Sequence, residues 1–242
     1  MRSMTHAVVG GLLATLACAQ GAGAAARTTS SVPAEQQVVT LYDVKRVSSR
    51  PAAGARMVGV VSAVRPITLK RTTLPVLEQK QDAEGRRWLK VRLPGRALNR
   101  SNPPLSGWIS TPFTRRTTVR WHVVVDVDAR QVLAYRDGRL MRSFGAIVGK
   151  PSTPTPRGKF FVEEALRMPA GKAGGPFALA ASARSHVYQQ FAGGPGQIAL
   201  HGVNGIGGQI GSAVSHGCIR MTTAGVTWLA QYIKAGTPLT IR

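Results

Sequence analysis

The sequence predicts a mostly β fold with one clear helix, and three observations carry this prediction. Short β-like runs recur from Val38 to about Thr114, separated by turn residues and without a helical period. Further strand patterns follow from Trp121 onward. One convincing amphipathic helix pattern occurs, near the C-terminus at residues 223–235. Together they predict a small β-barrel followed by a second β-rich domain that contains the helix.

The strands of the first region follow from apolar patterning and turn residues. Residues 88–93 (WLKVRL) alternate strictly between apolar and charged side chains after Trp88, as in a strand with one buried face. Pro94-Gly95 then turns the chain. Further strands are expected at residues 38–42, 57–61 and 107–109.

The pattern WLKVRLPGR…SGWI in this region resembles bacterial SH3-like modules that precede cell-wall enzymes. We therefore expect residues 38–114 to form a small SH3-like β-barrel. The resemblance implies that the module targets the substrate or acts as a spacer. A barrel that only supports the next domain is the alternative, and the sequence leaves it open.

The second region, residues 120–242, is predicted to be β-rich with one helix. Asp137-Gly138 is a hairpin signal between two strands. For the helix at 223–235, Thr222 or Thr223 can provide the N-cap, and Gly236 ends the pattern. Strands are expected at residues 121–127, 131–135, 142–148, 159–162, 197–201 and 237–241.

The N-terminus predicts an exported protein. A basic start with Arg2 and His6 precedes an apolar run over residues 7–19, and small residues follow, as in a secretory signal peptide. We expect residues 1–26 to be the signal peptide and 27–37 a linker, with no integral membrane span after cleavage. Retention through an uncleaved signal, or through lipidation of Cys18, is the alternative.

The charge balance predicts anionic partners. The chain has 32 Lys and Arg against 10 Asp and Glu, a formal net charge of +22. Such a field attracts polyanions. The basic residues are scattered singly or in pairs, without a basic helix or a nucleic-acid motif, so no nucleic acid is expected. Anionic polymers and carboxylate-rich peptides outside the membrane fit better, and we expect a monomer.

Once a signal peptide is removed, Cys218 is the single cysteine of the chain. A disulfide framework is then excluded, and a leftover thiol is either a small buried hydrophobe or a reactive group. A nearby histidine can take the thiol proton. His216 is in the same loop, whereas His201 ends a separate strand and can approach the sulfur more freely. His201 is therefore favoured as the base.

A zinc site is the alternative use of these residues. Zinc accepts histidine and cysteine ligands, and His201, His216, Cys218 and His186 could supply them. However, the sequence lacks a CxxC or HExxH spacing around them. We therefore predict no metal.

The residues around the cysteine resemble a known family. The segment HGVNGIGGQIGSAVSHGCIRM, from His201 to Met221, is similar to the active-site signature of the L,D-transpeptidases with a YkuD-type catalytic domain. The segments GKPSTPTPRGKF, from Gly149, and FAGGPGQIALHG, which leads into His201, resemble the same family's upstream strands and loops. The resemblance spans about residues 121–242 and implies a β-rich catalytic domain.

The resemblance implies roles position by position. Cys218 is expected to be the nucleophile and His201 the general base, oriented by the backbone carbonyl of Gly202. The other expectations concern loop and substrate contacts. Ser215 is expected to bond within the loop, His216 to shape the oxyanion or substrate region, Gly217 to permit the turn and donate to an oxyanion with Cys218, Arg220 to bind a substrate carboxylate or support the loop, and Tyr188 to line the cleft.

The resemblance also implies the substrate, a peptidoglycan stem peptide. Cys218 would form a thioester with the stem and pass it to an amine, which cross-links or remodels the cell wall and affects cell shape. No cofactor is implied. The alternatives are a carboxypeptidase, in which water resolves the same thioester, and a non-enzymatic wall-binding protein with two β modules. The acceptor is left open.

Overall fold

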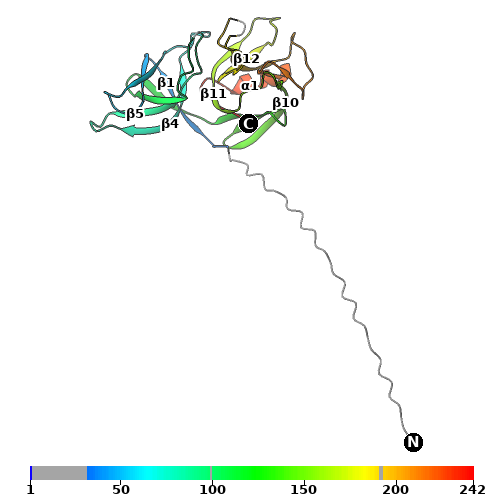
Figure 1. Cartoon of the computed structure of the whole chain (residues 1–242), viewed down its shortest axis with the longest axis horizontal. Helices are drawn as coiled ribbons and strands as arrows, with labels where there is room; N and C mark the ends of the chain where they lie inside the picture. The colour runs from blue at the N-terminus through cyan, green and yellow to red at the C-terminus, as the bar shows by residue number, and fades with distance from the viewer. Residues whose placement is uncertain (2–31, 99, 191–192) are drawn as a thin grey trace. The chain divides into compact units, whose positions relative to one another are not determined.

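The computed structural model describes Met1 and residues 32–98, 100–190 and 193–242 (Figure 1). Contacts divide the chain into a segment that ends at Ser30 and a unit from Ser31 to Arg242, and the structure below concerns that second unit. The signal peptide expected at 1–26 lies outside the described residues except for Met1. The first part of the expected linker at 27–37 lies outside them as well.

The first sheet has seven antiparallel strands, and their order is β3-β2-β6-β5-β4-β1-β7. Its apolar side chains form one core that includes Val39, Leu41, Leu74, Leu89 and Ile109. The strands are β1 Gln36–Leu41, β2 Lys45–Ser48, β3 Met57–Val61, β4 Thr73–Gln81, β5 Arg87–Arg92, β6 Ser106–Ser110 and β7 Thr114–Val119.

Three strands of this sheet were not expected from the sequence: β2, β4 and β7. Strand β7 (TRRTTV) has no buried residue, so no apolar alternation indicates it. It is held by pairing with β1 along six positions, from Gln36 opposite Val119 to Leu41 opposite Thr114. A strand made by backbone pairing alone leaves little trace in the side-chain pattern. Strand β1 also begins at Gln36, inside the stretch expected to be linker.

The second sheet has nine strands in the order β14-β10-β15-β13-β12-β11-β16-β8-β9, and β10 also pairs with β9. The first half of β10 pairs with β9, the last strand of this order, and its second half pairs with β15 at Ala146 and Ile147. The strands are β8 Trp121–Asp126, β9 Gln131–Arg136, β10 Arg139–Gly149, β11 Gly158–Arg167, β12 Phe177–Arg184, β13 Gln197–Gly202, β14 Ala213–Ser215, β15 Ile219–Met221 and β16 Pro238–Ile241.

The expected hairpin is confirmed, since Asp137 and Gly138 join β9 to β10 with φ of 53° and 73°. Strand β12 was not expected. Its sequence, FALAASAR, is rich in alanine, a weak strand former. Its position between β11 and β13, not its composition, makes it a strand.

The helix α1 spans Thr223–Tyr232 and packs its residues Val226 and Leu229 into the core of the second sheet, against β12 and β13. The expected cap is confirmed, because the Thr222 side chain accepts a hydrogen bond from the N–H of Gly225 at 3.1 Å. The expected end at residue 235 is wrong. Ile233 already has extended backbone, with φ −87° and ψ 122°.

The predicted mostly β fold with one helix is thus confirmed in the described part of the chain. The two sheets also share core packing. Phe161 of β11 is 1% exposed and belongs to the core of the first sheet. Among the described residues, no helix is long and apolar enough to span a membrane.

Candidate active site

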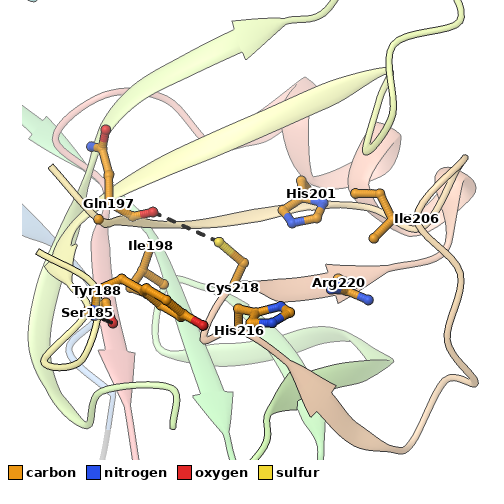
Figure 2. Close-up of a pocket in the computed structure, with 10 residues that line it drawn as sticks. Ser185, Tyr188, Gln197, Ile198, His201, Ile206, His216, Cys218 and Arg220 are labelled. Atoms are coloured by element: carbon orange, nitrogen blue, oxygen red, sulfur yellow. Dashed lines mark hydrogen bonds between the residues drawn. The ribbon is translucent and has the colours of Figure 1, made fainter. Parts of the chain in front are cut away.

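Two neighbouring parallel strands, β13 and β15, bring the expected site residues to one face. His201 lies opposite Arg220 in their register. Cys218 directly precedes β15 and stands two positions before Arg220, and alternate residues of an extended chain point to the same face. The strand pair therefore places Cys218, His201 and Arg220 on one side, and Figure 2 shows them around a single pocket.

This pocket has a volume of about 130 Å³. It contains five of the residues that the sequence singled out: Tyr188, His201, His216, Cys218 and Arg220. The remaining lining residues are Ser185, Gly196, Gln197, Ile198 and Ile206. The chain thus gathers a thiol, two imidazoles and a guanidinium in one place.

The ring of His201 is fixed by its neighbour's backbone. Its Nδ1 lies 2.8 Å from the carbonyl oxygen of Gly202, the contact expected from the sequence. A carbonyl only accepts hydrogen bonds, so Nδ1 carries the proton and Nε2 of the neutral ring is an acceptor. Burial lowers the pKa of His201; the bond to Gly202 opposes this, and the charge of Arg220 adds to it. The imidazole is therefore kept neutral near pH 7.

The thiol of Cys218 is also kept neutral. Burial raises the pKa of Cys218, while the backbone of Ala199 and the charge of Arg220 act in the opposite direction. Sγ lies 3.9 Å from the carbonyl oxygen of Gln197, in reach of a weak S–H hydrogen bond (Figure 2). A neutral thiol is a poor nucleophile, so reaction at this site requires a base at the moment of attack.

The loop before the cysteine is stabilised by hydrogen bonds within the loop itself. Gly217 has φ of 112°, a conformation that favours glycine. Ser215 is fully buried, and its hydroxyl donates to the carbonyl of Cys218 at 2.6 Å and accepts from the N–H of Gly217 at 3.1 Å. The expected bonding of Ser215 within the loop is present. The N–H of Gly217, expected as an oxyanion donor, is already occupied by Ser215, so the structure supports only its part in the turn.

A second segment supports the same loop and was missed by sequence reasoning. Thr153 and Thr155 are buried and donate to the carbonyls of Ser215 and Gly217, at 3.2 and 2.9 Å. They belong to the Pro-punctuated loop GKPSTPTPRGKF. The signal was present in that resemblance, but the sequence could not show which carbonyls these hydroxyls would meet.

The second region of the chain matches a known protein family. A sequence model of the L,D-transpeptidase catalytic domain, YkuD, matches residues 120–241. The chain belongs to the L,D-transpeptidase family. The match covers the second sheet and helix α1 and leaves the first sheet outside it.

Relatives of this family member were found in two Bacillus species. The chain is 33% identical over 124 residues to the YkuD protein of Bacillus subtilis (strain 168), covering 51% of this chain and 67% of that protein. It is 33% identical over 153 residues to the Bacillus licheniformis YkuD protein, covering 60% of this chain and 84% of the relative. An L,D-transpeptidase structure from Mycobacterium smegmatis is 20% identical with a TM-score of 0.39, covering 70% of this chain and 99% of that one. A likeness of that degree carries no conclusion about activity.

In this L,D-transpeptidase, Arg220 supports the loop, which is one of the two roles expected from the sequence. Nη1 of Arg220 donates to the carbonyl of Gly207 at 3.2 Å. Its charge also adds to the burial that lowers the pKa of His201 and opposes the burial that raises the pKa of Cys218. A contact with a substrate carboxylate stays a prediction.

The other two histidines near the signature have different places. His216 is exposed at the mouth of the pocket, with its ring centroid 5.8 Å from that of Tyr188. His186 lines a separate pocket beside Arg96 and Arg184. Within residues 32–98, 100–190 and 193–242, no group of three or more His, Cys, Asp or Glu is placed to hold a metal.

Proposed function

We propose that this protein is an exported L,D-transpeptidase in which Cys218 forms a thioester with a peptidoglycan stem peptide and transfers it to an amine. The observation that carries the proposal is the placement of Cys218 and His201 in one pocket, with the imidazole held by Gly202. Membership of the family supports the reaction type. Export is supported by the signal-like sequence of residues 1–26.

In the first half-reaction, Sγ of Cys218 attacks the carbonyl carbon of the scissile peptide bond, and Nε2 of His201 accepts the thiol proton. The C–S bond forms and the carbonyl becomes a tetrahedral oxyanion. The protonated His201 then gives its proton to the leaving nitrogen. The C–N bond breaks, an amine leaves, and a thioester on Cys218 remains.

In the second half-reaction, the acceptor amine attacks the thioester carbonyl. His201 accepts the amine proton, the C–S bond breaks, and the proton returns to the sulfur. The lowered pKa of His201 suits this role, since the base is unprotonated at the start of each half-reaction. The raised pKa of Cys218 means that the thiol is deprotonated only when His201 takes the proton.

The positive charge supports an anionic substrate. The net charge is +22, and stem peptides carry several carboxylates. A second pocket, of about 190 Å³, is lined by residues of both sheets. Its basic lining residues include Arg92, Arg96, Lys159 and Arg184. Among the described residues that line that pocket, none is acidic. Binding of anionic cell-wall polymers is part of the proposal.

Intact-protein mass spectrometry after incubation with a tetrapeptide stem tests the proposal. We expect a mass increase equal to the acyl donor, absent from Cys218→Ala. With a second stem as acceptor, the adduct should convert to a cross-linked dimer.

Three outcomes contradict the proposal in different ways. Release of tripeptide alone, with no dimer, would make the enzyme a carboxypeptidase. If no adduct forms under any condition, the proposed enzymatic activity is wrong and the non-enzymatic wall-binding protein is favoured. An adduct that persists in Cys218→Ala would displace Cys218 as the nucleophile.

A further inference from the structure

The turn at Pro94-Gly95, which the sequence marked only as the end of a strand, contacts strands β11 and β12 of the second sheet. Gly95 donates its N–H to Oε1 of Glu163 at 2.7 Å. A Cβ at Gly95 would lie 2.4 Å from the carbonyl oxygen of Ser182, so the close approach requires glycine. The loop that follows β5 is therefore built to lie against β11 and β12.

The next residue, Arg96, is buried against the turn formed by residues Ser185 to Gln189. It is 5% exposed. Its Nη1 and Nη2 each lie 3.3 Å from the carbonyl of Ser185, and Nη2 lies 3.0 Å from that of Tyr188 and 3.4 Å from that of Gln189. One guanidinium thus holds three carbonyls of a single turn, and its five N–H donors in a rigid planar fork suit this arrangement better than a compact ammonium group does.

The held turn is a wall of the active-site pocket. Ser185 and Tyr188 both line the pocket that contains Cys218. The hydroxyl of Ser185 accepts from the N–H groups of Val187 and Tyr188, at 3.2 and 3.0 Å, which closes the turn. Figure 2 shows Tyr188 beside His216, on the side of Cys218 away from His201.

The same loop is tied to the strand that bears Gln197. Oε2 of the buried Glu163 accepts from Nε2 of Gln197 at 3.1 Å and from Arg184 at 3.2 Å. Glu163 also pairs with Arg65 of the first-sheet region, and Nε of Arg184 donates to the carbonyl of Arg96 at 2.9 Å. Burying these charges is costly unless their hydrogen bonds are made, so the network favours one arrangement of the loop and the wall.

We propose that Arg96 is a positioning residue that holds the Ser185–Gln189 turn, and that the N-terminal β module thereby sets the affinity of the pocket for the acyl-donor stem. The inference rests on the proposed function for its substrate. His201 belongs to β13 and Cys218 directly precedes β15, whereas Arg96 bonds the backbone carbonyls of the turn, so we expect the proton transfer between Cys218 and His201 not to depend on Arg96. The N-terminal module is then a working part of the active site, beyond a role in targeting or spacing.

The test compares Arg96→Ala and Arg96→Lys with Arg100→Ala, which removes the same charge from an exposed position in the same loop. For Arg96→Ala we expect KM for the tetrapeptide stem to rise about tenfold with little change in kcat, because several charge-assisted hydrogen bonds are lost. Arg96→Lys should give a smaller rise. Arg100→Ala should match the parent chain. Alkylation of Cys218 by iodoacetamide, followed on its own peptide, should keep its rate in all variants.

Hydrogen exchange measured without substrate tests the restraint separately from the reaction. In Arg96→Ala, the amides of residues 185–190 should exchange faster while those of β13 and β15 do not. An unchanged KM and unchanged exchange in Arg96→Ala would overturn the inference. Faster exchange throughout the chain in both Arg96 variants would overturn it too, as the mark of a merely structural residue. Absence of a thioester in the parent chain would instead defeat the proposed function, while the exchange data still decide the restraint.

Discussion

Burial sets the protonation states of the candidate site, and one residue adjusts both of them. Burial lowers the pKa of His201 and raises that of Cys218; the positive charge of Arg220 adds to the first shift and opposes the second. The base needs to be unprotonated, so thioester formation should fall as the pH drops through the lowered pKa of His201, below its ordinary value of 6.5.

Replacing Arg220 by glutamine should raise the pH at which thioester formation begins to fall in acid. Without the positive charge, the pKa of His201 rises, and a larger share of the imidazole is protonated at pH 6. The pH dependence of thioester formation, followed by mass spectrometry, measures the shift. Arg115→Gln, an exposed change outside the pocket, should leave this pH unchanged. Equal midpoints in Arg220→Gln and the parent chain would contradict the assignment.

We expect His122 to act on stability, since it is not among the residues that line the pocket of Cys218. Burial, with the charge of Lys159 adding to it, lowers the pKa of His122 to about 4. Its Nε2 lies 2.8 Å from Oγ1 of Thr240. As the pH falls below 6.5, His122 of the unfolded chain becomes protonated, whereas His122 of the folded chain stays neutral until about pH 4. The free energy of unfolding therefore decreases between pH 6.5 and about pH 4.

We expect His122 to account for up to about 3 kcal/mol of the stability lost between pH 7 and pH 4. Urea unfolding of His122→Gln at both pH values should show a smaller loss than in the parent chain. The prediction fails if the two chains lose the same free energy of unfolding over this range.

At the scale of elements, local signals and pairing contribute differently. The cap of α1 was visible in the sequence because Thr222 acts on the N–H of Gly225, three residues away. The hairpin at Asp137-Gly138 was visible for the same reason, since a turn is made by adjacent residues. Strands β7 and β12 were not visible, because partners distant in the sequence make them strands.

Thr222→Ala should lower the free energy of unfolding by about 1 kcal/mol, the usual effect of losing an N-cap hydrogen bond. Chemical unfolding followed by circular dichroism measures the change. Thr223→Ala is the matched control, because Thr223 is the first residue of α1 and alanine is the better helix former there. Equal losses in the two variants would show that the cap bond contributes nothing.

For the whole molecule, the two sheets are joined by a shared core and by buried polar contacts. Phe161 of β11 packs in the core of the first sheet, and Glu163, two residues later, accepts from Gly95 and pairs with Arg65. The face of β11 that carries both residues thus belongs to the contact between the sheets. Stability of the second sheet should depend on the first.

Phe161→Ala should therefore cost about 3–5 kcal/mol, as expected for a phenylalanine removed from a close-packed core. Phe160→Ala should cost less, because Phe160 is only partly buried. Urea unfolding detects whether one transition is lowered as a unit. A cost for Phe161→Ala no larger than that for Phe160→Ala would contradict joint packing of the two sheets.

The sequence by itself determined the mostly β class, the hairpin, a threonine cap of α1 at Thr222 or Thr223, and the set of residues around Cys218. These depend on local patterns or on a contiguous signature, in which the reacting groups occur in a fixed order. Only the tertiary structure decided that Ser215 occupies the N–H of Gly217 and that Thr153 and Thr155 brace the same loop. The structure alone also placed Arg96 against the turn that forms one wall of the pocket. Arg96 and Ser185 are 89 positions apart, and a contact between a buried guanidinium and backbone carbonyls leaves no period or motif in the chain.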